Sequence, residues 1–237
     1  MSVKHQQLDP PDSMAAFLSN LTIQQPTPIS DDWFARTVFR GQTYSWTTFP
    51  KIDRDGFIER RDGRSRDKHE KWLVDHFRRR AHPHLSIPPS GDWEWLALAQ
   101  HHGLATRLLD WTYNPLVALY FAVEYDDDRD GVVHAYHHQG STSEDNADPF
   151  DIESVVLFAP PHISNRIVVQ SSCFTAHPED IDSDELWDGS WATIPIVAHR
   201  KQFIRNELVQ VGINRATLFP DLDGLANFLN DQSGRRT

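Results

Sequence analysis

Residues 96–122 combine apolar runs with charged side chains, and this combination restricts the fold more than any other feature of the chain. Residues 93–100 are apolar around almost the whole helical circumference, which predicts a buried helix. Gly103 is placed to end that helix, because glycine adopts the left-handed conformation without a Cβ clash. The run 105–111 predicts a short strand. Asn114-Pro115 predicts the start of a second helix, since Asn caps free N–H groups and a first-position Pro loses no hydrogen bond.

This apolar segment contains two histidines and two charged residues: His101, His102, Arg107 and Asp110. An unpaired charge in such surroundings would cost several kcal/mol, so these groups must be paired, exposed in a cleft, or functional. A structural Arg107–Asp110 pair and a role in a binding site both remain open. If the run is a strand, positions 107 and 110 point to opposite faces, and each charge then needs a different partner.

The rest of the chain predicts helices in the first half and strands in the second. Helices are predicted from about Ser13 and over 65–82, 203–211 and 222–229. Strands are predicted over 33–39, 131–136, 155–158, 166–169 and 192–198, the last at a sheet edge because it contains Pro195. This mixture predicts a single α+β domain around a mostly antiparallel sheet. Residues 1–30 are expected to form an arm with a short helix, 31–230 the domain, and 231–237 a frayed tail.

Composition excludes several classes of protein. The chain of 237 residues carries a formal charge of −11, which argues against bulk binding of nucleic acid, since counterion release needs clustered Lys and Arg. A local basic pocket remains compatible with that charge. The single Cys173 excludes an intrachain disulfide and indicates a reducing compartment. No apolar run approaches the roughly 20 residues that span a bilayer, and no signal peptide is evident. We therefore expect a cytoplasmic protein without membrane contact.

The common catalytic motifs do not occur. The 13 histidines include no His-Glu-x-x-His pattern, and a single cysteine gives no Cys pair for zinc, so no metal is expected. Cys173 lies beside Phe174 in a predicted strand, where a buried thiol is inert unless its pKa is lowered. Neither a Gly-x-Ser-x-Gly elbow nor a phosphate-binding Gly-x-x-x-x-Gly-Lys loop is present.

A set of short motifs carries a family resemblance. They are Phe39-Arg40-Gly41-Gln42, Gln100-His101-His102-Gly103, Thr106-Arg107-Leu108-Leu109-Asp110-Trp111-Thr112 and Ala118-Leu119-Tyr120-Phe121-Ala122. Together they resemble the FRG-domain family, which is named for the first motif and occurs largely in bacteria and their phages. The likeness covers roughly residues 33–230. Membership alone implies no particular reaction.

The order of these motifs is also similar to that of toxin-type ADP-ribosyltransferases. The resemblance implies that Arg40, Gly41 and Gln42 bind NAD, the substrate of those enzymes. Residues 110–112 stand where the family has Ser-Thr-Ser, which assigns Trp111 and Thr112 to the NAD site. Gln170 stands where the family has its glutamate. Gln170 cannot carry the negative charge that stabilises an oxocarbenium-like centre, so Asp110 is expected to supply it.

These observations lead to the hypothesis of an NAD-using ADP-ribosyltransferase or NAD glycohydrolase, a toxin or antiviral defence effector. Arg40 would clamp phosphate and Gly41 would allow close approach of the ligand. His101 and Arg107 would orient ribose or phosphate, and Asp110 would stabilise the charge at C1′. Trp111 or an aromatic residue of 44–49 would stack on nicotinamide. The alternative is a non-catalytic sensor or inhibitor module that binds a nucleotide or a protein. The sequence identifies neither the trigger nor any macromolecular acceptor.

Overall fold

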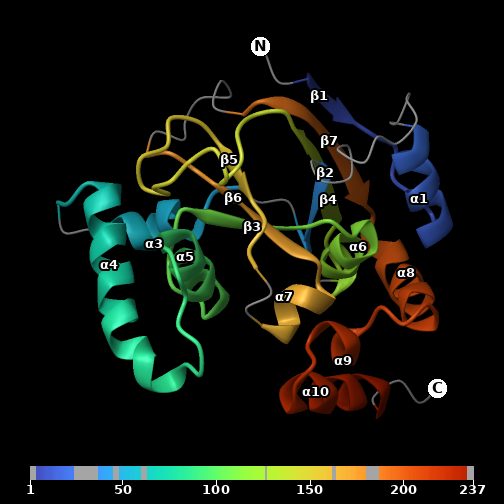
Figure 1. The fold of residues 1–237 in the computed structure, drawn as a ribbon. Helices are drawn as coiled ribbons and strands as arrows, with labels where there is room; N and C mark the ends of the chain where they lie inside the picture. Colours follow the sequence, from blue (N-terminus) through green and yellow to red (C-terminus); the bar gives the residue numbers. More distant parts are fainter. Residues whose placement is uncertain are drawn as a thin grey trace.

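The computed structural model describes residues 4–23, 37–44, 48–59, 63–125, 127–161, 164–179 and 187–233. These ranges form one mixed sheet of seven strands in the order β1-β7-β4-β2-β3-β6-β5 (Figure 1). β1 runs parallel to β7, and every other neighbouring pair is antiparallel. The strands are β1 (Lys4–Gln7), β2 (Thr37–Gln42), β3 (Leu108–Thr112), β4 (Gly131–His138), β5 (Val156–Phe158), β6 (Ser172–Ala176) and β7 (Gly189–Ile196).

Helices occur along the whole chain, so the structure is a single α+β domain, as predicted, but the helices are not concentrated in its first half. They are α1 (Met14–Ile23), α3 (Asp55–Ile58), α4 (Arg66–Ala81), α5 (Asp92–His101), α6 (Pro115–Val123), α7 (Asn165–Val169), α8 (Ala198–Gln210), α9 (Arg215–Leu218) and α10 (Leu222–Ser233). Two 3-10 turns, η1 (Lys51–Asp53) and η3 (His82–His84), flank α4 along the chain. No helix within the described ranges has the length and apolar character needed to cross a membrane.

Two helices cover adjacent parts of the same sheet face. α5 packs over β3, β5 and β6, where Leu96 and Ala97 contact Leu108 and Phe174. α6 packs over β2 and β4 and joins α8 in the largest apolar cluster of the described residues. The opposite face carries an aromatic cluster around Trp111, which faces away from both helices. β3 therefore lies under the junction between α5 and α6 (Figure 1).

The local signals around β3 act as predicted. α5 is buried along its centre, and Gly103 follows it with a φ of 84°. The side chain of Asn114 accepts a hydrogen bond from Leu116 N–H at 2.9 Å, with Pro115 at the first position of α6. α4 begins directly after Ser65, close to the predicted boundary.

Other elements differ from the prediction. Residues 166–169 lie in helix α7, because Ser164 caps that segment by accepting a hydrogen bond from Ile167 N–H. β7 is not an edge strand: Pro195 lies just beyond the four residues of β7 that pair with β1. Residues 4–7, expected in an arm, form β1. Of the predicted strand 33–39, residues 33–36 lie outside the described ranges.

A buried ion pair attaches α4 to the start of β3. Arg107 is fully buried and donates from Nε to Glu70 Oε2 at 2.7 Å, while Glu70 is itself 0% exposed. The backbone N–H of Arg107 also donates to Glu70, and its Nη2 donates to the half-buried Asp67 at 2.6 Å. Burial raises the pKa of Glu70, and the charge of Arg107 opposes that rise. The attraction between the two opposite charges offsets the free-energy cost of removing both from water.

Removing one member of this pair is expected to destabilise the fold strongly. Glu70→Ala leaves Arg107 charged and without its main partner, and the free energy of unfolding should fall by about 3–5 kcal/mol in urea titrations. Glu59→Ala, at an exposed position, is the control and should change it by less than about 0.5 kcal/mol. A double variant, Glu70→Leu with Arg107→Met, should lose less than Glu70→Leu alone; equal losses would contradict the role of the pair.

A buried histidine predicts loss of stability in acid. Burial, reinforced by Arg66 and Arg107, lowers the pKa of His177 to about 3. The unfolded chain therefore binds a proton to this residue at a higher pH than the folded chain does. The neutral His177 therefore makes its full contribution to the free energy of unfolding above pH ~6.5. Below that pH the contribution falls by up to about 1.4 kcal/mol per pH unit. His177→Gln should reduce the slope of unfolding free energy between pH 6.5 and 5; an unchanged slope would contradict this.

Candidate functional site

The sheet opens between β2 and β3. These strands pair at a single position, Phe39 with Thr112, whereas β2 pairs with β4 over six residues and β3 with β6 over five. A pocket of about 470 Å³ lies at this opening, between α5 and α6. Its lining includes most of the residues selected from the sequence: Arg40, Gly41, His101, Asp110, Trp111, Thr112 and Gln170.

Arg40 bridges the gap between the two strands. Its Nη1 donates to the carbonyl oxygen of Asp110 at 2.7 Å, replacing the backbone ladder that stops at Phe39. Its Nε is buried and has no hydrogen-bond partner among the described residues. Burial lowers the pKa of Arg40, and Asp110 opposes the shift. Because a guanidinium stays protonated in proteins, Arg40 places a permanent positive charge in the pocket.

Asp110 presents an exposed carboxylate held by a chain of hydrogen bonds. Gln100 Nε2 donates to Asp110 Oδ2 at 2.9 Å. The hydroxyl of Thr106 donates to Gln100 Oε1 at 2.7 Å, which fixes the amide so that its NH₂ group faces the carboxylate. Gln100 and Thr106 therefore act as positioning residues. Neither was predicted from the sequence as a site residue, although both stand in motifs that carry the family resemblance.

His101 lies in the same pocket, at the end of α5. Burial is the main cause that lowers the pKa of His101. The charges of His102 and Arg166 lower this pKa further, while the charge of Asp110 raises it. The imidazole is therefore neutral near pH 7 and offers one donor and one acceptor. No hydrogen bond to another described residue occupies either nitrogen, so both remain available to a ligand.

Three further cations line the pocket: Lys51 from η1, Arg54 just after it, and Arg166 from α7. With Arg40 they set four cationic side chains against Asp110, which is the one carboxylate among the described lining residues. These three cations were not predicted from the sequence, because they come from separate segments and belong to no recognisable motif. The structure therefore contains a local basic pocket, which is compatible with the negative net charge of the chain.

Two predicted site residues lie outside the pocket. Arg107, expected to orient ribose or phosphate, is committed to Glu70 and Asp67 at the sheet's edge toward α4. Arg107 and Asp110 therefore do not form the ion pair that the sequence left open, and each has a different partner. Gln42, expected to contact NAD, is buried, and its Oε1 lies 3.2 Å from His134 Nε2. Neither residue is positioned to touch a ligand in this pocket.

The structure assigns different roles to Trp111 and Gly41. Although Trp111 contributes to the lining, its indole packs on the opposite face with Tyr136, and Nε1 donates to Thr175 Oγ1 at 2.8 Å. The indole of Trp111 is therefore not positioned to stack on a ligand in this pocket, contrary to the prediction from the sequence. A Cβ on Gly41 would lie 1.8 Å from the carbonyl oxygen of Ala118. Glycine is required there for the approach of α6, rather than for the approach of a ligand.

Thr112 and Gln170 hold the far wall of the pocket together. The hydroxyl of Thr112 donates to the backbone oxygen of Gln170 at 2.6 Å, and Gln170 Nε2 donates to Leu218 O at 2.9 Å. Gln170 follows helix α7 instead of a predicted strand, so its position does not reproduce a strand-borne glutamate. Of the aromatic stretch 44–49, residues 45–47 lie outside the described ranges, while Tyr44 packs on Arg129.

Neither metal nor thiol chemistry is supported by the described side chains. Among them, no group of three His, Cys, Asp or Glu residues could hold a metal ion. Cys173 is fully buried, and burial raises the pKa of its thiol. Since the thiolate is the reactive form, this cysteine is inert.

Comparison with known proteins gives a family match for part of the chain. The model of the FRG domain matches residues 35–131 of the 237. The match begins two residues before β2, ends at the first residue of β4, and includes Arg40, His101 and Asp110. No curated protein and no solved structure matches the chain. The far wall of the pocket, including Arg166 and Gln170, lies outside the matched segment.

Replacing Gly41 tests whether packing or ligand approach requires a glycine. Gly41→Ala is expected to displace α6 and lower the free energy of unfolding by at least about 2 kcal/mol, measured in urea without ligand. Gly56→Ala is the matched control, because a Cβ there meets nothing within 4 Å. Alanine is favoured in helices, so the control should be neutral or slightly stabilising. Unchanged stability of Gly41→Ala, with ligand binding lost, would support the ligand-approach interpretation instead.

Proposed function

We propose that the pocket binds NAD and promotes cleavage of the bond between nicotinamide and ribose, as an NAD glycohydrolase or ADP-ribosyltransferase. The observation that carries this proposal is the placement of Asp110, an exposed and oriented carboxylate within a pocket lined by cations. NAD consumption of this kind would give the protein the role of a toxin or defence effector. The FRG domain itself is compatible with this chemistry and does not demand it.

The reaction breaks the C1′–N1 bond of the nicotinamide ribose. The bonding electron pair moves to the ring nitrogen, which leaves as neutral nicotinamide, and positive charge develops on C1′ and the ribose ring oxygen. A fixed carboxylate near that centre stabilises the developing positive charge. Water then adds its oxygen to C1′ and releases a proton, giving ADP-ribose; a nucleophile on an acceptor would add in the same way.

The remaining lining residues fit the other parts of the molecule. Arg40 supplies charge-assisted hydrogen bonds suited to phosphate oxygens. Neutral His101 can both donate to and accept from ribose hydroxyls. The pocket volume of about 470 Å³ lies in the ordinary range of small-molecule and cofactor sites.

A second candidate is nucleotide binding without turnover, as expected of a sensor or inhibitor module. It is favoured by Gln170, whose amide N–H is already bonded to the backbone of α9. The described lining also contains a single carboxylate, Asp110. If Asp110 stabilises the charge on the ribose, no second carboxylate of this lining remains to act as the general base that would deprotonate an acceptor. The two candidates share the ligand and differ in the product.

Nicotinamide release from NAD tests the proposal. Asp110→Asn should lower kcat about 10²–10³-fold, the usual effect of removing one preorganised electrostatic group, with little change in NAD affinity. Asp75→Asn, at an exposed position on α4, is the control and should retain wild-type activity. Equal rates for wild type and Asp110→Asn would refute the proposed mechanism. A rise in Tm with NAD and no nicotinamide release by the wild type would establish the second candidate.

A further inference from the structure

The pocket cations differ from six of the ten arginines that the structure describes outside the pocket, whereas Arg64, Arg79, Arg80 and Arg129 likewise have no ion pair among the described residues. Six arginines lie within 4.0 Å of a carboxylate oxygen: Arg66, Arg78, Arg107, Arg200, Arg205 and Arg215. The pocket residues Lys51, Arg54 and Arg166 have no such partner among the described residues. The chain has 34 acidic and 23 basic residues, so three cations without an ion pair in one pocket run against its overall charge. Within the described residues, Lys51, Arg54 and Arg166 are therefore positioned at the pocket without an ion-pair partner of their own.

Each of these three side chains is held in place by a neutral group. Lys51 Nζ donates to Gly103 O at 2.7 Å. Arg54 donates from Nε and Nη2 to Phe49 O, both at 3.3 Å. The guanidinium of Arg166 lies over the ring of Phe219, 4.5 Å from its centroid. These contacts fix the direction of the side chains and leave their positive charges uncompensated.

The charges also influence the groups deeper in the pocket. Arg54 contributes to lowering the pKa of Arg40, and Arg166 contributes to lowering the pKa of His101. Like charges held this close repel one another, and a bound anion relieves that repulsion. Arg54 and Arg166 are exposed, so an anion can reach them from solvent. Forked guanidinium donors match the oxygens of phosphate groups.

We propose that Lys51, Arg54 and Arg166 form a clamp for a diphosphate group, so that the pocket selects ligands with two linked phosphates over monophosphates and nucleosides. This inference rests on the proposed nucleotide-binding function of the pocket. Two linked phosphates supply at least two negative charges and oxygens that reach donors on separate segments, η1 with its following turn and α7. A single phosphate offers fewer acceptor oxygens to the same donors. Arg166 lies outside the segment that the FRG model matches.

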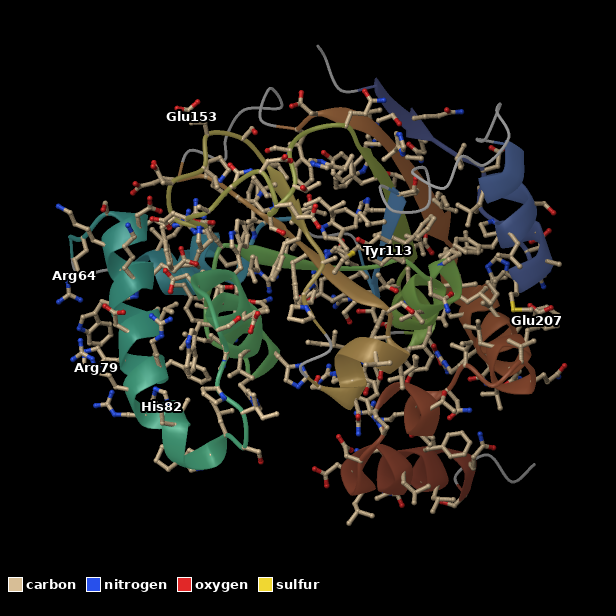
Figure 2. The ribbon with its side chains drawn as sticks, viewed as in Figure 1. Arg64, Arg79, His82, Tyr113, Glu153 and Glu207 are labelled. Carbon is tan, nitrogen blue, oxygen red and sulfur yellow. The ribbon has the colours of Figure 1, made fainter. Side chains whose placement is uncertain are left out.

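Calorimetric titration of the full chain with ADP, AMP and adenosine tests the clamp. The wild type should bind ADP at least tenfold more tightly than AMP, with adenosine weakest. Arg54→Ala and Arg166→Ala should each reduce the ratio of AMP to ADP dissociation constants to about threefold or less. Arg79→Ala is the matched control, because Arg79 projects from the outer side of α4 (Figure 2), and it should keep the wild-type ratio.

Two results would overturn the clamp: a wild-type ratio near one, including undetectable ADP binding, or an unchanged ratio in both pocket variants. The wild-type ratio needs no variant, so the test does not depend on the folding of substituted proteins. Nicotinamide release separates this inference from the proposed reaction. Selective ADP binding without NAD cleavage retains the clamp and refutes the reaction. NAD cleavage with an unchanged KM in Arg54→Ala and Arg166→Ala retains the reaction and refutes the clamp.

Discussion

The early end of pairing between β2 and β3 is the constraint on which the site depends. If the register continued beyond Phe39 and Thr112, Arg40 would lie opposite Trp111 and Gly41 opposite Asp110. The backbone carbonyl of Asp110 instead accepts from the guanidinium of Arg40. The donor that replaces a backbone N–H at this position therefore carries a positive charge. The interior of the sheet therefore contains a polar opening in place of a continuous ladder.

The helices on either side keep this opening from closing. α5 is attached to one half of the sheet through Leu96 and Ala97, and α6 is attached to the other half, with its backbone against Gly41. The end of α5 supplies Gln100 and His101, while the strand beneath supplies Asp110. Because the motif residues 100–112 span the end of a helix and the following strand, they meet at one wall of the pocket.

Neighbouring charges within one motif have separate tasks. Arg107 precedes β3 and is buried against Glu70, where it fixes α4 to the sheet. Asp110, three residues later, faces the pocket and is oriented by Gln100. The requirement that each charge find its own partner could be predicted from strand alternation. The identity of the partners could not, since Glu70 lies 37 residues from Arg107 and no local pattern connects them.

Local signals predicted the elements closest to the site, and their limits explain the errors. The caps at Asn114 and Gly103 act between adjacent residues, so the boundaries of α5 and α6 followed from the sequence. Residues 166–169 resemble a strand in composition, but the cap at Ser164 and their packing made them helix α7. The role of Gly41 depended on a helix that lies about 75 residues away along the chain. The convergence of Lys51, Arg54 and Arg166 was a property of the tertiary structure alone.

The most direct test is a crystal structure of Asp110→Asn grown with NAD, in which the ligand should remain uncleaved. We expect the nicotinamide ribose beside the side chain at position 110 and the diphosphate against Arg54 and Arg166. NAD bound on another surface, or a pocket left empty at saturating NAD, would contradict the assignment of this opening as the functional site.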